Sequence, residues 1–381
     1  MNSSNITTRT ATRFTELDGI RGWASLSVLF YHVFWEIFGV AIPDFRNILT
    51  ATLFNGTLSV TVFFVLSGEA LSIGFWERKD ARFVQKMALK RYPRLTIPIF
   101  FSCLLVYVLM ISHLTYSNEA AEIVNRRDWL GSFLNFSPNF IGLIKHSMLE
   151  VYLHHKPSLS YNAFLWTMKV EMIGSIVIFI LLTFKTRDLR KVVLAVSLGG
   201  ILLISEDFTA CFLFGMGIGY FRVKGNFAKL RENRKFQVAA IPLLLIILVA
   251  GGIPQLSGVS GQSVYKPLYV ILSVAIVFLA QESIILSNAL KNRLSGFLGK
   301  ISFPLYLVQF SVFVSFTSFE IVYFKSHSGL TPSVMWLIAI TTITLSLLLA
   351  NFFGIIEKMA HWASGKFASF IVSIPRQSRG L

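Results

Sequence analysis

Long apolar runs separated by short polar stretches recur along the whole chain. A run of roughly 20 apolar residues can cross the hydrocarbon core of a membrane as an α-helix. Such runs occur at 22–40, 57–75, 95–114, 163–184, 236–253, 265–285, 301–323 and 333–356. Two shorter runs, at 192–204 and 208–221, are separated by three polar residues. The pattern predicts an all-α membrane protein with about ten transmembrane helices. If the two short runs form a re-entrant hairpin instead, two crossings vanish together and the other helices keep their orientation.

The composition agrees with a membrane protein. Of the 381 residues, 54% are hydrophobic and only 14% are charged, whereas soluble domains are about 25% charged. The run at 22–40 follows a polar segment and ends without a small-x-small cleavage site, so we expect a retained span and not a signal peptide. The two cysteines, Cys103 and Cys211, both lie in apolar runs. This excludes a disulfide framework and a cysteine-based zinc site.

The positive charge is unevenly distributed. The formal net charge is +16. If the N-terminus is cytoplasmic, 27 of the 35 Lys and Arg residues fall on the cytoplasmic side and six on the outer side. Because cytoplasmic loops are enriched in Lys and Arg, both termini are predicted to be cytoplasmic, in a multi-pass protein of the inner or plasma membrane. The excess of basic residues is then explained by the membrane topology, so no nucleic acid is expected as a partner. We expect cytoplasmic tails at 1–16 and 358–381 and a membrane domain at 17–357.

A histidine lies inside the first apolar run. Ionisable side chains within a span are costly and indicate function by default. His32 is either a structural histidine bonded to a neighbouring helix or a desolvated general base. Arg21 lies eleven residues earlier, on nearly the same helix face and about 16 Å nearer the cytoplasm. Asp18 is placed to pair with Arg21 or to cap the helix. Glu36, at i+4 from His32, either orients the imidazole or lies in interfacial water.

Two further groups are candidate site residues. Glu171 lies about 12 Å below the outer edge of its span, close to the expected depth of His32, and is either functional or structural. Neighbouring Lys169 points elsewhere on the helix. Arg91 and Arg94 flank Pro93, which fits the first turn of a helix. Their guanidinium groups suit a phosphate, although basic residues at cytoplasmic helix ends also follow the topology rule.

Other polar patterns carry less information. His154 and His155 lack partners at metal-ligand spacing, so we expect surface exposure and no metal site. Gly215, Gly217 and Gly219 favour close helix packing. The segment 115–162 is the only place for a substantial outer structure, and it is too short for an independent domain. The sequence contains no Walker loop, dinucleotide fingerprint or zinc-protease motif.

Several segments in order resemble the acyltransferase-3 family of multi-pass membrane O-acyltransferases, of the O-antigen acetylase type. The similarity begins at Leu17-Asp18-Gly19-Ile20-Arg21-Gly22, where an Arg precedes His32 with ten residues between them. It continues with Phe63-Phe64-Val65-Leu66-Ser67-Gly68, the Arg91 to Arg94 pair, Leu165 to Glu171, Phe297 to Ser302 with Leu305-Tyr306-Leu307, and Ile356-Glu357. Together these segments cover residues 17–357.

The resemblance implies a chemistry. The donor would be an acyl-CoA, in the simplest case acetyl-CoA, bound from the cytoplasm, and the acceptor a hydroxyl of a glycan or glycolipid. His32 would be the catalytic base, with Glu171 orienting His32 or the acceptor. Arg21, Arg91 and Arg94 would support the donor, and Asp18 would support Arg21. No permanently bound cofactor is implied, because a thioester is already activated.

Two positions depart from the family pattern. Glu69 stands where an aromatic residue is usual, and Gln309 lies in a region where a histidine is frequent. Gln309 can hold a sugar hydroxyl but cannot act as a base, so we expect Gln309 and Ser67 to contact substrate. Two alternatives stay open: a proton-coupled transporter or flippase, and an acyltransferase acting on a small secreted molecule.

Overall fold

The structure of the chain, a computed structural model, describes residues 15–259 and 261–373. It is 83% helical, and the described residues contain no strand. The α-helices are α1 (Thr15–Phe30), α2 (Ile48–Leu53), α3 (Gly56–Arg78), α4 (Ala81–Ile111), α5 (Ser117–Ile123), α6 (Phe140–Lys145), α7 (Val151–Leu153), α8 (Thr167–Thr183), α9 (Asp188–Ile204), α10 (Thr209–Val223), α11 (Ala228–Glu232), α12 (Arg234–Leu256), α13 (Lys266–Glu282), α14 (Ile284–Ala289), α15 (Arg293–Val312), α16 (Ser318–His327) and α17 (Pro332–Ser373). Three π-helical segments, η1 (Tyr31–Ile37), η4 (His146–Glu150) and η8 (Phe313–Thr317), continue α-helices. Short 3₁₀ turns are η2 (Pro43–Phe45), η3 (Leu130–Ser132), η5 (Pro157–Leu159), η6 (Ala163–Trp166) and η7 (Ser263–Tyr265).

The membrane class predicted from the sequence is confirmed. Within the described residues, seven helical segments are long and apolar enough to cross a membrane, and they coincide with seven of the long apolar runs. The remaining long run falls on α1 and η1, which form one continuous helix that carries Glu16, Asp18, Arg21 and Glu36. The two short runs form α9 and α10, of 17 and 15 residues. The total of ten crossings and the cytoplasmic location of both termini stay predictions.

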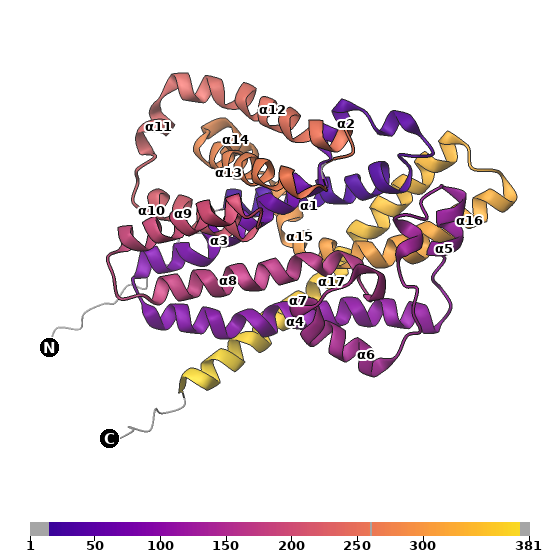
Figure 1. The fold of residues 1–381 in the computed structure, drawn as a ribbon, viewed down its shortest axis with the longest axis horizontal. Coiled ribbons are helices and arrows are strands. Elements are labelled where there is room, and N and C mark those ends of the chain that lie inside the picture. Colours follow the sequence, from indigo (N-terminus) through magenta and orange to yellow (C-terminus); the bar gives the residue numbers. More distant parts are fainter. Residues whose placement is uncertain (1–14, 260, 374–381) are drawn as a thin grey trace.

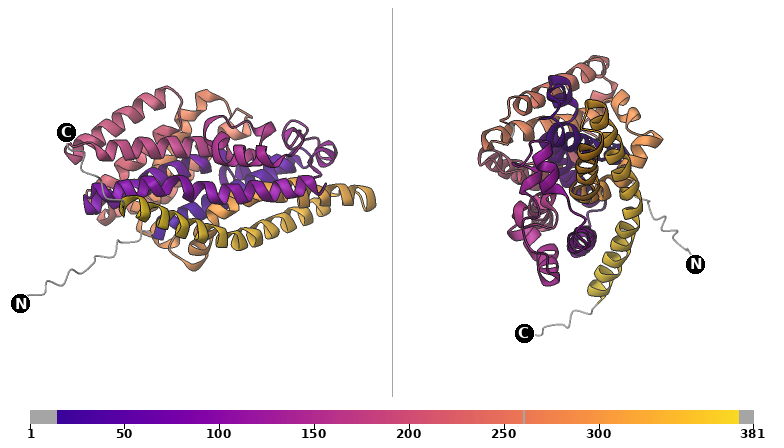
Figure 2. Two further views of the ribbon diagram at one scale, coloured as in Figure 1. Left: turned by 90° about the horizontal axis from the view of Figure 1, so that it is seen from below. Right: turned by 90° about the vertical axis from the view of Figure 1, so that its right-hand side faces the viewer.

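Two helices extend beyond the predicted ends of their spans. α4 begins at Ala81, so Pro93 lies in the helix interior and not in the first turn as expected. The 42-residue α17 continues through Glu357 to Ser373 without a break. Ala360, Ser364 and Ala368 recur at helical spacing and are buried on one face, which explains the continuation. Figure 2 shows α17, in yellow, along the edge of the bundle.

The segment 115–162 is folded against the bundle. It contributes short helices at the end of the molecule that also carries α2 and α16 (Figure 1). Some of its apolar side chains are fully buried in the same hydrophobic core as residues of α1 and α15, among them Ala120, Leu130, Leu143 and Val151. The segment therefore contributes to the core of the helix bundle.

Two of the helices that carry the candidate site, α3 and α15, belong to the most buried segments of the bundle. In the segments that contain α3 and α15, 67% of the most apolar stretch is buried inside the protein, whereas in α12 the buried share is 22%. Glycines permit the close approach of the central helices. A Cβ at Gly68 of α3 would lie 2.0 Å from the Phe212 carbonyl oxygen of α10, and one at Gly215 of α10 would lie 2.1 Å from the Val65 carbonyl oxygen. The packing role predicted for Gly215 therefore holds.

Candidate active site

A cavity of about 670 Å³ opens among α1, α3, α4, α8, α15 and α17. This volume lies within the range of small-molecule sites in proteins. Its lining includes seven of the eight residues singled out from the sequence: Asp18, Arg21, Ser67, Arg91, Arg94, Glu171 and Gln309. The eighth, His32, contacts the side chain of Gln309. The fold thus brings together residues that are up to 291 positions apart in the sequence.

His32 lies at the start of the π-helical segment η1, where the regular helix of α1 ends. Such π-bulges are frequent at functional sites. The imidazole stacks on Phe164, with ring centroids 4.2 Å apart and planes inclined by 14°. Phe313 meets the imidazole edge-on at 5.8 Å. The ring is therefore held between aromatic side chains, and the residue as a whole is partly buried.

Gln309 determines which imidazole nitrogen carries the proton. The amide nitrogen of Gln309 donates to the Tyr306 carbonyl oxygen, so its Oε1 faces His32 Nδ1 at 3.3 Å. Because an amide oxygen only accepts, Nδ1 must carry hydrogen in this contact, and the free lone pair is left on Nε2. Gln309 was expected to contact substrate, and the structure places it against His32.

Glu171 pairs with Arg91. This ion pair is partly buried, and Ser67 Oγ donates to the same carboxylate oxygen at 2.8 Å. Arg91 Nε donates to Ser175 Oγ, also at 2.8 Å. Glu171 was expected to orient His32 or the acceptor. In the structure it accepts hydrogen bonds from Arg91 and Ser67 on the wall of the cavity, and its role toward the acceptor stays a prediction.

The cavity lining is predominantly positive. Arg21 Nη2 donates to the Leu66 carbonyl oxygen at 3.2 Å, which fixes α1 against α3. Among the described residues, Arg94 makes no hydrogen bond or ion pair, although Glu357 attracts it across the cavity. The lining contains five cationic side chains, Arg21, Arg91, Arg94, Lys300 and Lys358, but only three carboxylates, Asp18, Glu171 and Glu357. An anionic ligand would be attracted to this surface.

Several lining residues were not found from the sequence. Tyr306, in a motif that carried no assigned role, contacts Thr167 Oγ1 at 2.7 Å and donates to the Phe164 carbonyl oxygen. Lys358 and His361 line the cavity because α17 continues past the predicted end of its span. Glu357 and His361 are four residues apart, so both lie on the same face of α17 once the helix is known to continue through them.

Two expectations about neighbouring residues are wrong. Glu36 was expected to orient His32 or to lie in interfacial water. It is buried and is hydrogen-bonded to Tyr31 and Arg126. His155 was expected at the surface, but it is half-buried, and its Nε2 lies 3.1 Å from the Ala163 carbonyl oxygen. Its ring lies 5.6 Å from His146, a buried histidine that had no sequence signal. His154 is exposed as expected.

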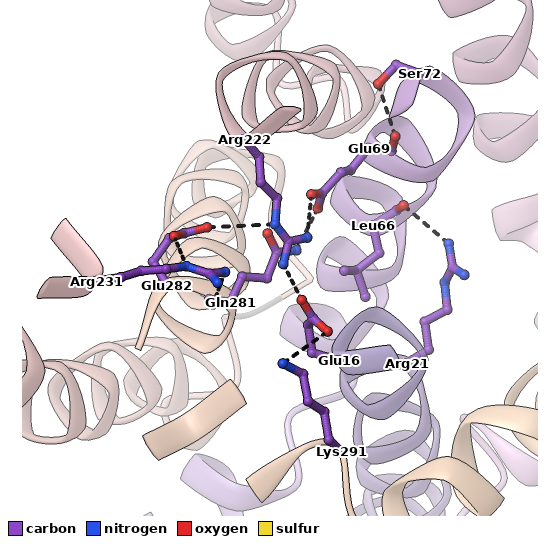
Figure 3. Close-up of polar contacts among 10 residues, drawn as sticks. All are labelled: Glu16, Arg21, Leu66, Glu69, Ser72, Arg222, Arg231, Gln281, Glu282 and Lys291. Atoms are coloured by element: carbon purple, nitrogen blue, oxygen red, sulfur yellow. Dashed lines mark hydrogen bonds and ion pairs between the residues drawn. The ribbon is translucent and has the colours of Figure 1, made fainter. Parts of the chain in front are cut away.

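A buried ion network lies beside the cavity, on the other side of α3 (Figure 3). Arg222 of α10 pairs with Glu16, Glu69 and Glu282, which come from α1, α3 and α13. Arg231 and Lys291 neutralise Glu282 and Glu16 from the rim, and Gln281 donates to Glu69 at 2.6 Å. Glu69, which departs from the family pattern, thus has a structural partner. The network connects α10 and α13 to the two helices that carry Arg21 and Ser67.

Residues 14–351 match a family model described as an acyltransferase domain. This range includes seven of the eight long apolar runs and both short ones completely, and all eight candidate site residues. No curated protein and no solved structure matches the chain.

Proposed function

The chain belongs to the acyltransferase-3 family, and on this basis we propose that it is a membrane enzyme that moves an acyl group from acyl-CoA to a hydroxyl group of a cell-surface carbohydrate or lipid-linked glycan. Acetyl-CoA is the simplest donor. The observation that carries the proposal is the positively lined cavity that reaches Gln309 and, through it, His32.

The chemistry follows from the orientation of the imidazole. Nε2 of His32 takes the proton of the acceptor hydroxyl while that oxygen attacks the thioester carbonyl carbon. The tetrahedral intermediate collapses, the carbon–sulfur bond breaks, and the CoA sulfur receives the proton back from the imidazolium. Gln309 keeps the other nitrogen protonated and the ring in place. The products are the O-acyl ester and free CoA, and no other reactant is needed.

The donor fits the cavity by charge. CoA carries phosphate groups at one end and the reactive thioester at the end of a long flexible arm. Arg94, Lys300 and Lys358 are suited to bind phosphates, and the arm would extend toward Gln309. In this arrangement Arg91 is held by Glu171, so its guanidinium is already oriented before the donor binds.

The test is transfer of label by purified protein in nanodiscs. Acetyl-CoA labelled in the acetyl group is added with a crude extract of cell-surface glycans, and label on the glycan and free CoA thiol are both measured. We expect equal amounts of the two products without any ion gradient. Glycan or lipid translocation that requires a gradient and consumes no acyl-CoA would contradict the proposal and support a transporter.

A further inference from the structure

Trp129 lies beside the imidazole of His32 on a segment far away in the sequence. Its ring centroid is 5.7 Å from that of His32 and 6.1 Å from that of Phe164, the ring on which His32 stacks. Phe133, at 5.1 Å, supports Trp129 edge-on. The side chain is partly exposed. An aromatic surface therefore continues outward from the imidazole.

Arg126 holds this segment in place. The arginine is 4% exposed and donates to Glu36 twice, to the carboxylate at 2.6 Å and to the backbone carbonyl. It also donates to Asp128 at 2.9 Å and lies 5.6 Å from the centre of the Trp129 ring. Glu36 belongs to η1, the π-helical segment that begins beside His32. One buried cation thus joins the Trp129 segment to the helix of the proposed base.

Two surfaces meet at His32. The cavity reaches Gln309, and its lining, as far as the structure describes it, includes neither His32 nor Trp129. His32 is nevertheless partly exposed as a residue, and its ring lies 5.7 Å from that of Trp129. If the donor enters through the cavity, the Trp129 side is free for the second substrate.

The chemistry of this side indicates what it would bind. Trp129 offers an apolar aromatic face. Next to it, the side chain of Asp128 is 71% exposed and carries a carboxylate that accepts hydrogen bonds. Hydrogen bonding from Arg126 lowers the pKa of Asp128, so this carboxylate is ionised at neutral pH. An aromatic side chain next to a carboxylate that accepts hydrogen bonds is suited to a ligand ring with C–H groups on its face and hydroxyl groups at its edge.

We propose that Trp129, held in place by Arg126 and Glu36, is a wall of the acceptor site and determines specificity for a cyclic polyhydroxylated acceptor such as a pyranose. Asp128 accepts hydrogen bonds from its hydroxyl groups. The inference rests on the proposed function, because it requires an acceptor that reacts at His32. It adds the residues that would select the acceptor and the side from which it enters.

The experiment measures the half-saturating concentrations of glycan extract and of acetyl-CoA separately, in the nanodisc assay. For Trp129→Ala we expect the glycan value to rise about tenfold, as for the loss of one good stacking contact, with the acetyl-CoA value unchanged. Trp129→Phe should restore most of the difference, and Asp128→Asn should also raise only the glycan value. The control is Trp336→Ala, because Trp336 is a tryptophan that packs on Phe34 and Phe45 and is 48% exposed. We expect no change from this control.

The outcomes separate this inference from the proposed function. If wild-type protein shows no glycan-dependent CoA release, the proposed function fails. If wild-type protein is active and Trp129→Ala leaves the glycan value unchanged, the function stands and this inference is overturned. The inference is equally overturned if Trp129→Ala or Trp129→Phe shifts the glycan and acetyl-CoA values together, because such a shift indicates a structural role.

Discussion

Arg222 allows the sharpest prediction about stability. Its side chain is 5% exposed, and the carboxylates of Glu16, Glu69 and Glu282 around it are between 0% and 6% exposed. In Arg222→Met the side chain keeps a similar length but loses its charge. Among the described residues, the hydrogen bond that the Glu69 carboxylate then keeps is the one from the Gln281 amide, while Arg231 and Lys291 still reach Glu282 and Glu16.

The cost follows from the loss of a buried partner. Removing one member of a buried ion pair destabilises a protein by about 3–5 kcal/mol, because an uncompensated charge stays buried. We expect the free energy of unfolding of Arg222→Met to fall by an amount in this range. The matched control is Arg231→Met, whose side chain is 41% exposed and pairs with Glu282. When Arg231 is lost, Glu282 keeps Arg222 at 3.8 Å, so the control should be milder than Arg222→Met, which removes a partner from three buried carboxylates at once.

The two cysteines provide the assay. Cys103 and Cys211 are free and fully buried, so a thiol-reactive fluorescent dye labels the protein only when the bundle opens. Labelling of the detergent-solubilised protein should begin at a distinctly lower temperature for Arg222→Met than for wild type and for Arg231→Met. If Arg222→Met and Arg231→Met open at the same temperature as wild type, Arg222 is not the centre of the network and the reasoning is refuted.

Two further predictions concern the cavity and the 115–162 segment. Glu171→Gln removes the counterion that orients Arg91, so we expect the KM for acetyl-CoA to rise about tenfold. The control Lys169→Gln changes an exposed neighbour and should leave this KM unchanged. A KM of Glu171→Gln equal to that of wild type would contradict the role given to Glu171. Burial, assisted by His155 and opposed by Glu150, lowers the pKa of His146 from 6.5 to about 4. The unfolded chain therefore binds more protons in this range, and roughly 3 kcal/mol of stability, present above pH 6.5, is lost as the pH falls to 4. Dye labelling across this pH range should show the loss in wild type and a smaller loss in His146→Gln, and identical pH profiles would contradict it.

Several of the residues that line the cavity carry a local signal in the sequence, whereas Ser67 and Gln309 were singled out only by the family resemblance. Arg21 and His32 lie on one face of a single helix, and Glu171 is a charge inside an apolar run, so periodicity and hydropathy alone single them out. The packing of the helices that carry these residues then brings their side chains together. The structure adds the pairing: Glu171 positions Arg91, and Gln309 rather than Glu36 or Glu171 contacts His32.

The long-range partners could not be predicted. Arg126 and Glu36 are 90 residues apart, and Arg126 lies in a segment without hydrophobic periodicity, so no pattern relates the two. Arg222 lies at a predicted cytoplasmic helix end, where the topology rule already accounts for a basic residue. The rule explains the presence of Arg222 but says nothing about three glutamates that reach it from three other helices. The start of α4 predicted from Pro93 was wrong for a similar reason. Tertiary packing overrode the local preference of proline for the first turn of a helix.

The role of His32 is tested most directly by acetyl transfer in nanodiscs with wild type, His32→Ala and the control His327→Ala, whose histidine is exposed on α16. General bases contribute about 10²–10⁴-fold to rate. We predict that His32→Ala loses glycan-dependent CoA release by a factor in this range, while it still binds acetyl-CoA and starts to label with the thiol dye at the wild-type temperature. His327→Ala should match wild type. Wild-type turnover by His32→Ala would contradict the account.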